Sequence, residues 1–488
     1  MANSRIVHVI RKFIKKLLSK RDNAPNSIMP ENAPIIIKKI VHNINPTLLS
    51  KNAIQVIDTL QQAGYKAFVV GGAVRDLLLG IQPKDFDVAT NAHPEQVKRL
   101  FRRAHIIGRR FQIVHVRFGS EIIETSTFRA MINIENSKQI GTCRSKRSEL
   151  DRKTHVTDES GRVLRDNVWG RQDEDAARRD FTVNAMYYDP STQTVHDYHG
   201  GWQDIQSRVM RIIGDPATRF REDPVRMLRI VRFAAKLNFS IDETTQAPIR
   251  QLAPLIDNVP GARLFDEILK LLFSGHALNC VQKLRQQGLH HTILPLLDVV
   301  FEQPLGEKFV MLSLANTDQR IREGKSVSPS FLFAALLWHL VLEKWKIYQR
   351  TGQYPIPTLY LAMNDVLNSQ TSQLAIQRRF ISDMKEIWGL QARLDKRVGR
   401  RTPLRLLKHP RFRAGYDFLL LRCESGEIPA DEGQWWTDFI NGDPSTREKL
   451  LSQRKVPTAN KRRRHSSRKS NGRSNETVTS ENSGNRVL

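Results

Sequence analysis

The chain has 488 residues, enough for about three domains. Its 77 Lys and Arg residues outnumber its 50 Asp and Glu residues. The formal net charge of +27 is more than solubility requires, which indicates a polyanionic partner: nucleic acid first, an anionic membrane surface second. The three widely spaced cysteines contain no CxxC pair, so they indicate neither a disulfide framework nor a zinc site, and they favour a reducing, cytoplasmic compartment.

The first 50 residues form a basic N-terminal extension. Residues 5–20 repeat Ile, Phe and Leu at helical spacing opposite Arg and Lys, which predicts a short amphipathic helix that contacts a membrane surface or a partner. A solvated, frayed terminus is the alternative. Basic residues interrupt every apolar run here, so the segment does not resemble a secretion signal. The longest apolar run, Phe331 to Leu342, is shorter than the roughly 20 residues that span a bilayer and predicts a buried helix.

Residues 51–200 predict a compact α/β domain. Helix, strand, turn, helix and strand follow one another from Ala53 to Thr90, and strands 112–118 and 121–128 flank a short turn as a hairpin. Residues 130–172 are polar, charged and aperiodic, so we expect a mobile loop. The pattern is helical over 201–290 and 291–450, where apolar residues recur every 3.6 positions. The basic tail, 451–488, has almost no apolar residues and is expected to be disordered.

Two aspartates define the first candidate site. Asp85 and Asp87 stand on either side of one phenylalanine in a segment that reads as extended, so both side chains point to the same face. Two like charges this close are unfavourable unless a cation lies between them. A pair of divalent cations about 4 Å apart is one established solution. The spacing therefore predicts a metal site on Asp85 and Asp87.

An anion-binding turn precedes the aspartates. Gly71 and Gly72 end a short apolar strand and open a helix, whose first backbone N–H groups are free to receive phosphate oxygens. Arg75 lies one turn into that helix. A Gly-Gly pair alone is weak evidence, but an anion-binding turn followed by a carboxylate pair is what phosphoryl or nucleotidyl transfer requires.

A third carboxylate is expected to complete the metal site, and two residues are candidates. Glu124 lies on the strand 121–128 between apolar neighbours, where an inward acid would be costly without a cation. Asp180 follows two arginines in RRDFTVNAMYY. The simpler alternatives are an exposed acid on the strand for Glu124 and a helix N-terminal cap for Asp180.

The segment REDPVRMLR predicts a helix with Asp223 as its N-cap and Pro224 at the first helical position. Glu222 and Asp223 both fall near Arg226, and an intrahelical ion pair is the simple interpretation. The alternative is recognition of a base edge, in which a carboxylate accepts from an exocyclic amine and a guanidinium donates to a ring nitrogen. Adenine and cytosine both present that pattern, so such a pair would select A and C together.

These ordered motifs resemble the bacterial branch of the tRNA nucleotidyltransferase and poly(A) polymerase superfamily over roughly residues 53–290. The resemblance implies an α+β fold, with a small polymerase beta-like nucleotidyltransferase head followed by an all-helical neck, body and tail. It also implies ATP as substrate and two Mg²⁺ ions on Asp85 and Asp87. Asp180 would be the third acid or a ribose contact, and Asp223 and Arg226 would read the incoming base.

The segment 106–119, in which Arg109 and Arg110 follow a glycine, is similar to the poly(A) polymerase branch. Polyadenylation of mRNA or small-RNA 3′ ends, promoting processing and decay, is therefore the favoured function. CCA addition to tRNA and RNA binding without catalysis are the alternatives. Basic stretches should follow the RNA backbone by charge and offer surfaces to RNA-chaperone or decay-machinery partners. The candidate RNA-binding residues are Arg109, Arg110, Arg400, Arg401, Arg411, Arg462, Arg463 and Arg464.

Overall fold

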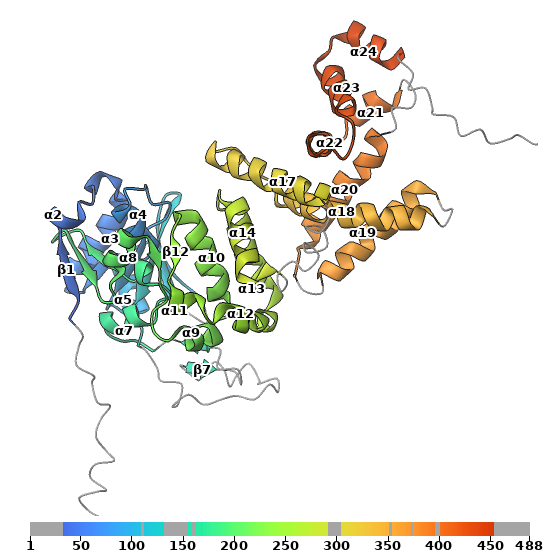
Figure 1. Cartoon of the computed structure of the whole chain (residues 1–488). Helices are drawn as coiled ribbons and strands as arrows, with labels where there is room; N and C mark the ends of the chain where they lie inside the picture. The colour runs from blue at the N-terminus through green and yellow to red at the C-terminus, as the bar shows by residue number, and fades with distance from the viewer. Residues whose placement is uncertain are drawn as a thin grey trace, which may run out of the picture.

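The computed structural model describes residues 33–108, 112–130, 155–157, 163–166, 168–290, 304–350, 354–371, 374–395 and 401–452. The N-terminal segment 5–20, most of the expected loop and nearly all of the basic tail lie outside these residues. Within the described ranges, a sheet-containing head at one end is followed by helices through to the other end, as Figure 1 shows from blue to red. This confirms the α+β class expected from the sequence.

The head is built on an eight-stranded sheet with the order β1-β10-β9-β2-β3-β6-β5-β4. Neighbouring strands are antiparallel except β3 and β6, which are parallel. The strands are β1 (Ile35–Lys38), β2 (Ala67–Val70), β3 (Asp87–Thr90), β4 (Ala104–Ile107), β5 (Ile113–Phe118), β6 (Glu121–Thr127), β9 (Tyr187–Asp189) and β10 (Thr194–Asp197). The predicted hairpin is confirmed as β5 and β6.

Helices α3 and α5 cover one face of this sheet. The α3 helix is capped by Ser50, whose hydroxyl accepts from the Ala53 amide at 3.3 Å, and its apolar side chains are buried. Asp87 of β3, Glu124 of β6 and His115 of β5 are paired in register and lie on the opposite face. The helical segments of the head are α2 (Lys39–His42), η1 (Pro46–Leu48), α3 (Lys51–Gln62), α4 (Gly72–Leu78), α5 (Pro94–Leu100), α7 (Gln172–Ala177), η3 (Thr182–Asn184) and α8 (Gly201–Ser207).

Two segments differ from the expected domain boundaries. Residues 35–38 belong to the head, because β1 pairs with β10 in register from Ile35↔Asp197 to Lys38↔Thr194. A pairing partner about 160 positions away leaves no local signal in the sequence. Within the segment expected to be a mobile loop, the strands β7 (His155–Thr157) and β8 (Val163–Asp166) pair with each other.

The neck packs directly against the head, since one continuous hydrophobic core contains residues of both. Its central helix, α10, buries one apolar face that includes Met227, Ile230 and Ala234, and packs on α13 and α14. The elements of the neck are β11 (Val209–Met210), α9 (Pro216–Glu222), α10 (Val225–Leu237), β12 (Ser240–Ile241), α11 (Glu243–Gln246), α12 (Ile249–Leu252), η4 (Ala253–Asn258), α13 (Gly261–Leu272) and α14 (Ala277–Gln287).

The remaining helices form the body and tail. The predicted buried helix is confirmed within α18, whose residues 332–341 are buried, and no described helix is long and apolar enough to cross a bilayer. Helix α20 joins two cores, because Trp388 packs in the main core and Leu394 packs with the aromatic residues of α23. The helices are α17 (Pro304–Arg322), α18 (Pro329–Gln349), α19 (Pro355–Thr371), α20 (Arg378–Leu394), α21 (Arg401–Leu407), α22 (Phe412–Ser425), α23 (Ala430–Asn441) and α24 (Pro444–Ser452).

Candidate active site

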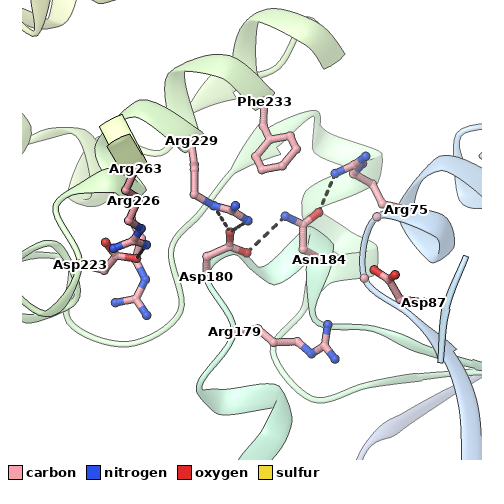
Figure 2. A pocket seen from close by; sticks show the side chains of 12 residues that line it. Arg75, Asp87, Arg179, Asp180, Asn184, Asp223, Arg226, Arg229, Phe233 and Arg263 are labelled. Carbon is pink, nitrogen blue, oxygen red and sulfur yellow. Dashed lines mark hydrogen bonds and ion pairs between the residues drawn. The ribbon is translucent and has the colours of Figure 1, made fainter. Parts of the chain in front are cut away.

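A cavity of about 400 Å³ lies where the head meets the neck (Figure 2). Five arginines and three aspartates contribute to its wall, a composition that suits a polyanion bound together with cations. The lining residues are Gly71, Gly72, Arg75, Asp87, Arg179, Asp180, Asn184, Asp223, Arg226, Arg229, Phe233 and Arg263. The cavity therefore brings together most of the residues predicted from the sequence, whereas Asp85 and Glu124 do not line it.

The turn between β2 and α4 forms one end of the cavity. Gly71 has φ +72°, a conformation that favours glycine, and a Cβ at this position would lie 3.4 Å from Nη1 of Arg179. The same Cβ would lie 4.0 Å from Oδ2 of Asp87. The backbone that opens α4 is thus held close to a guanidinium and a carboxylate, as binding of a phosphate with its counterion requires.

Two further carboxylates act on the charge of Asp87 near this turn. Asp87 begins β3 and is in register with Glu124 on β6, so the two side chains are neighbours on the same sheet face. The pKa of Asp87 is raised to about 6, mainly because protein surrounds the carboxyl, and next because of the negative charge of Glu124. Arg179 opposes this rise, and Asp85 adds to it. A cation would relieve the concentrated negative charge.

The donor set fits Mg²⁺, a hard cation that prefers carboxylate oxygens. Strand register makes Asp87 and Glu124 neighbours, but their carboxylates do not form a closed cage around one point. Among the residues that the structure describes, no three His, Cys, Asp or Glu side chains lie close enough together to hold a metal ion. Glu124, and not Asp180, is the acid that the fold places beside Asp87.

Asp180 instead joins the head to the neck. Its Oδ2 accepts from Nε and Nη2 of Arg229 on α10, at 2.9 and 2.5 Å. Its Oδ1 accepts from Asn184 at 3.3 Å and from the Phe181 amide at 2.8 Å. Burial by itself would raise the pKa of Asp180, but Arg229 and the hydrogen bond from Asn184 hold it below its ordinary value. Figure 2 shows Asp180 between Arg229 and Asn184.

Arg75, expected to contact phosphates, is buried and has protein partners. Nε and Nη2 donate to Asp76 at 2.9 and 2.6 Å, and Nη1 donates to Asn184 at 2.7 Å. Its guanidinium also lies 5.1 Å from the ring centre of Phe233. Arg75 therefore supports the wall of the cavity and extends the polar chain from Arg229 through Asp180 and Asn184 into α4.

Arg179 is the arginine that lies beside the phosphate turn, although the sequence analysis noted it only as a neighbour of Asp180. Its Nε donates to Tyr187 at 3.3 Å and its Nη2 to Asp175 at 3.1 Å, which leaves Nη1 on the side of Gly71. Burial works against the charged form, but Tyr187 and Asp175 outweigh burial and raise the pKa of Arg179 above its ordinary value. Arg179 is thus a fixed positive charge at this end.

The far wall contains the predicted base-reading pair. Asp223 has an extended backbone and its Oδ1 accepts from the Val225 amide at 3.3 Å; the N-cap of α10 is Pro224 rather than Asp223, so the helix begins one residue later than predicted. Its Oδ2 accepts from Arg263 of α13 at 2.6 Å. Nη1 of Arg226 donates to Glu222 at 2.9 Å, and because Glu222 ends α9, the ion pair that was expected within one helix instead joins α9 to α10. Because Arg226 also lines the cavity, both interpretations of this pair are compatible.

Sequence reasoning did not find Asn184, Arg229, Phe233 and Arg263. The spacing of Arg226 and Arg229 within one helix was visible, but only the fold shows that Arg229 meets Asp180. Of the expected RNA-binding residues, Arg401 begins α21, and Arg411 donates to Asp383 at 2.5 Å. The others lie outside the described residues: Arg109, Arg110, Arg400, Arg462, Arg463 and Arg464.

A glycine turn that opens a helix, strand carboxylates beside it and a polar pair on the opposite wall form the arrangement expected of a nucleotidyltransferase. Family models match residues 67–211 (Poly A polymerase head domain), 238–301 (Probable RNA and SrmB-binding site of polymerase A) and 351–470 (Polymerase A arginine-rich C-terminus). Poly(A) polymerase I of Salmonella typhi is 43% identical over 466 residues, covering 94% of this chain and 97% of the relative. The chain belongs to the poly(A) polymerase family.

Other comparisons agree with this assignment. Poly(A) polymerase I of Haemophilus influenzae is 42% identical and covers 86% of this chain and 90% of its own length. The CCA-adding enzyme of Lactobacillus helveticus is 36% identical but covers 47% of this chain and 52% of its own length. The solved Thermotoga maritima CCA-adding enzyme, at 18% identity and a TM-score of 0.52, covers 86% of this chain and 93% of its own, which shows a shared fold.

We expect Asp87→Asn to stabilise the metal-free protein at pH 7.5 by at most about 1 kcal/mol, since the side chain is open to solvent on the cavity side. A carboxyl with a folded-state pKa of about 6 against an ordinary 3.8 destabilises the folded protein above pH 6. This cost fades as the pH falls towards 4. Urea unfolding in EDTA at pH 7.5 and at pH 4 measures the difference in free energy of unfolding between the variant and the unmodified protein. Asp58→Asn, in the exposed part of α3, is the control, and a pH-independent gain would contradict the expectation.

Proposed function

We propose that this protein transfers AMP from ATP to RNA 3′-hydroxyls without a template and releases pyrophosphate. The observation that carries the proposal is one nucleotide-sized cavity with carboxylates and a phosphate turn on the head and a base-reading pair on the neck. The relatives named Poly(A) polymerase I match this chain along almost its whole length, which favours adenosine addition. The relatives named CCA-adding enzyme match about half of it.

We propose that Asp85 and Asp87 hold two Mg²⁺ ions, with Glu124 as the third carboxylate. Bound there, the ions would lower the pKa of the RNA 3′-hydroxyl and neutralise the charge on the departing pyrophosphate. The residues of the chain have separate tasks. The turn at Gly71 and Gly72 receives phosphate oxygens through backbone N–H groups, and Arg179 adds a fixed positive charge beside them.

The base would lie against the neck. Arg226 is held by Glu222 and by the backbone carbonyl of Arg219 through Nη1 alone, so Nε and Nη2 are oriented for a ring nitrogen. Asp223 is oriented by Arg263 and retains acceptor capacity for an exocyclic amine. These two groups accept adenine and cytosine alike, so the preference for ATP has to arise from the shape of the wall around them.

We propose further that basic surfaces guide the RNA towards the cavity. Arg401 on α21 and the arginine-rich segments on either side of the described tail would contact the phosphate backbone without reading sequence. Arg411 is a weaker candidate for contact with RNA, because Asp383 and Glu386 already pair with it. The same surfaces are the candidate sites for RNA-chaperone or decay-machinery partners, in a cytoplasmic setting. Residues 5–20 are the candidate for contact with an anionic membrane surface.

The test of the function is nucleotide incorporation. Given a generic single-stranded RNA, Mg²⁺ and all four nucleoside triphosphates, the protein should add a long run of adenosines. Asp85→Asn and Asp87→Asn should each abolish addition while remaining folded, since each removes a metal ligand and relieves like-charge repulsion. Addition of only C, C and A, restricted to tRNAs that lack their 3′ end, would overturn the assignment. Normal turnover by either variant would overturn the metal site.

We expect Arg226→Ala to reduce the preference for ATP over GTP and UTP more than it reduces RNA binding. The guanidinium faces the proposed base position, and loss of one hydrogen-bonded contact of this kind costs about 10- to 100-fold in discrimination against bases that lack the adenine pattern. Competition of ATP with GTP for incorporation and a separate filter-binding assay for RNA measure the two effects. Arg221→Ala, an exposed residue of the same stretch, is the matched control. Equal losses in both assays would instead assign Arg226 to the RNA backbone.

A further inference from the structure

A row of polar side chains crosses four strands beside the cavity. Strand register places Asp87 opposite Glu124, Glu124 opposite His115, and His115 opposite His105. Directly paired residues point to the same side of a sheet, so these four side chains lie in one line on the face that α3 and α5 leave uncovered. Val114 and Val116, which flank His115 in β5, are buried on the other face. Because successive side chains of a strand alternate between the two faces, the imidazole of His115 lies on the same face as the carboxylates of Asp87 and Glu124.

His115 and Glu124 form the central contact of this row. Nε2 of His115 lies 3.4 Å from Oε1 of Glu124. That nitrogen is shielded from solvent and has no hydrogen-bond partner within the described part of the chain, so Glu124 is the acceptor towards which a small rotation would bring it. Glu124 is still half exposed, with 52% of its side chain accessible, and is therefore free to turn either towards Asp87 or towards solvent.

Two interpretations of this contact are open to test. An incidental surface ion pair would change any equilibrium by about fivefold at most. A residue that orients a metal-binding carboxylate commonly changes metal affinity by about 10- to 100-fold. The row favours the second interpretation, because His115 contacts the carboxylate whose charge acts more strongly on Asp87 than that of Asp85 does, and because β5 holds His115 there through backbone pairing on both sides.

We propose that His115 is a positioning residue that donates a hydrogen bond from Nε2–H to Glu124 and holds this carboxylate beside Asp87. In this way it sets the affinity of the site for its divalent cation. The role needs only a neutral imidazole that carries its proton on Nε2. It rests on the proposed function, in which Asp87 and Glu124 act on a metal ion.

The test measures metal binding without catalysis. Mn²⁺ is titrated into the full-length protein at pH 8, with a non-cleavable ATP analogue and no RNA, and free Mn²⁺ is followed by electron paramagnetic resonance. We expect His115→Phe, which keeps a ring of similar size but lacks the donor, to weaken Mn²⁺ binding by about tenfold. His115→Gln retains a donor at nearly the same reach and should bind Mn²⁺ within about threefold of the unmodified protein. His105→Phe, one strand further from Glu124, is the control and should have no effect.

A double-mutant cycle shows whether His115 acts through Glu124. If it does, His115→Phe has no further effect on Mn²⁺ affinity in a Glu124→Gln background. An undiminished tenfold loss in that background, or unchanged affinity in a folded His115→Phe protein, would overturn the proposal. Asp87→Asn separates this failure from that of the proposed function. If Asp87→Asn abolishes Mn²⁺ binding and His115→Phe leaves it intact, only the role of His115 is lost; if Asp87→Asn also binds normally, the metal site itself is wrong.

Discussion

The ion pair between Asp180 and Arg229 is the contact on which the geometry of the active site depends. Asp180 belongs to the head and Arg229 to the central helix of the neck, and two hydrogen bonds join them. The pKa of Arg229 is raised, chiefly by the charge of Asp180, so each group stabilises the charged form of the other. Removing either partner would deprive the other of its main counter-charge in a largely shielded position, which destabilises the folded protein. The pair thus fixes how the two domains face each other.

This ion pair holds the two ends of the cavity, the turn at Gly71 and the pair of Asp223 and Arg226, at a fixed separation. The polar chain continues from Asp180 through Asn184 to Arg75, which lies in the helix that opens with the phosphate turn. On the other side, Arg229 lies one helical turn beyond Arg226, which is proposed to read the base. A change at one end is therefore transmitted to the other through packed and hydrogen-bonded groups. The distance between the proposed phosphate and base positions is therefore set by all of these contacts together, and not by Asp223 and Arg226 alone.

Local patterns predicted those parts of the site that depend on neighbouring residues. The glycine turn before α4 and the start of α10 just after Asp223 each arise within a few positions, so the sequence shows them directly. Partners that are distant along the chain were not predictable, such as Arg263, which meets Asp223 from 40 positions away. Strand register decided between Glu124 and Asp180 as the neighbour of Asp87, and register depends on the assembled sheet. Arg75 was expected to contact phosphates, but its side chain donates to Asp76 and Asn184, because a buried charge is unfavourable without protein partners.

A structure of the protein with Mg²⁺ and a non-cleavable ATP analogue tests the central claim most directly, namely that one nucleotide bridges the head and the neck. The account places the triphosphate against Gly71, Gly72 and Arg179, with the cation on the strand carboxylates. It places the adenine between Asp223 and Arg226, with the Asp180–Arg229 pair intact. A nucleotide bound in the reverse orientation, or outside this cavity, would contradict it.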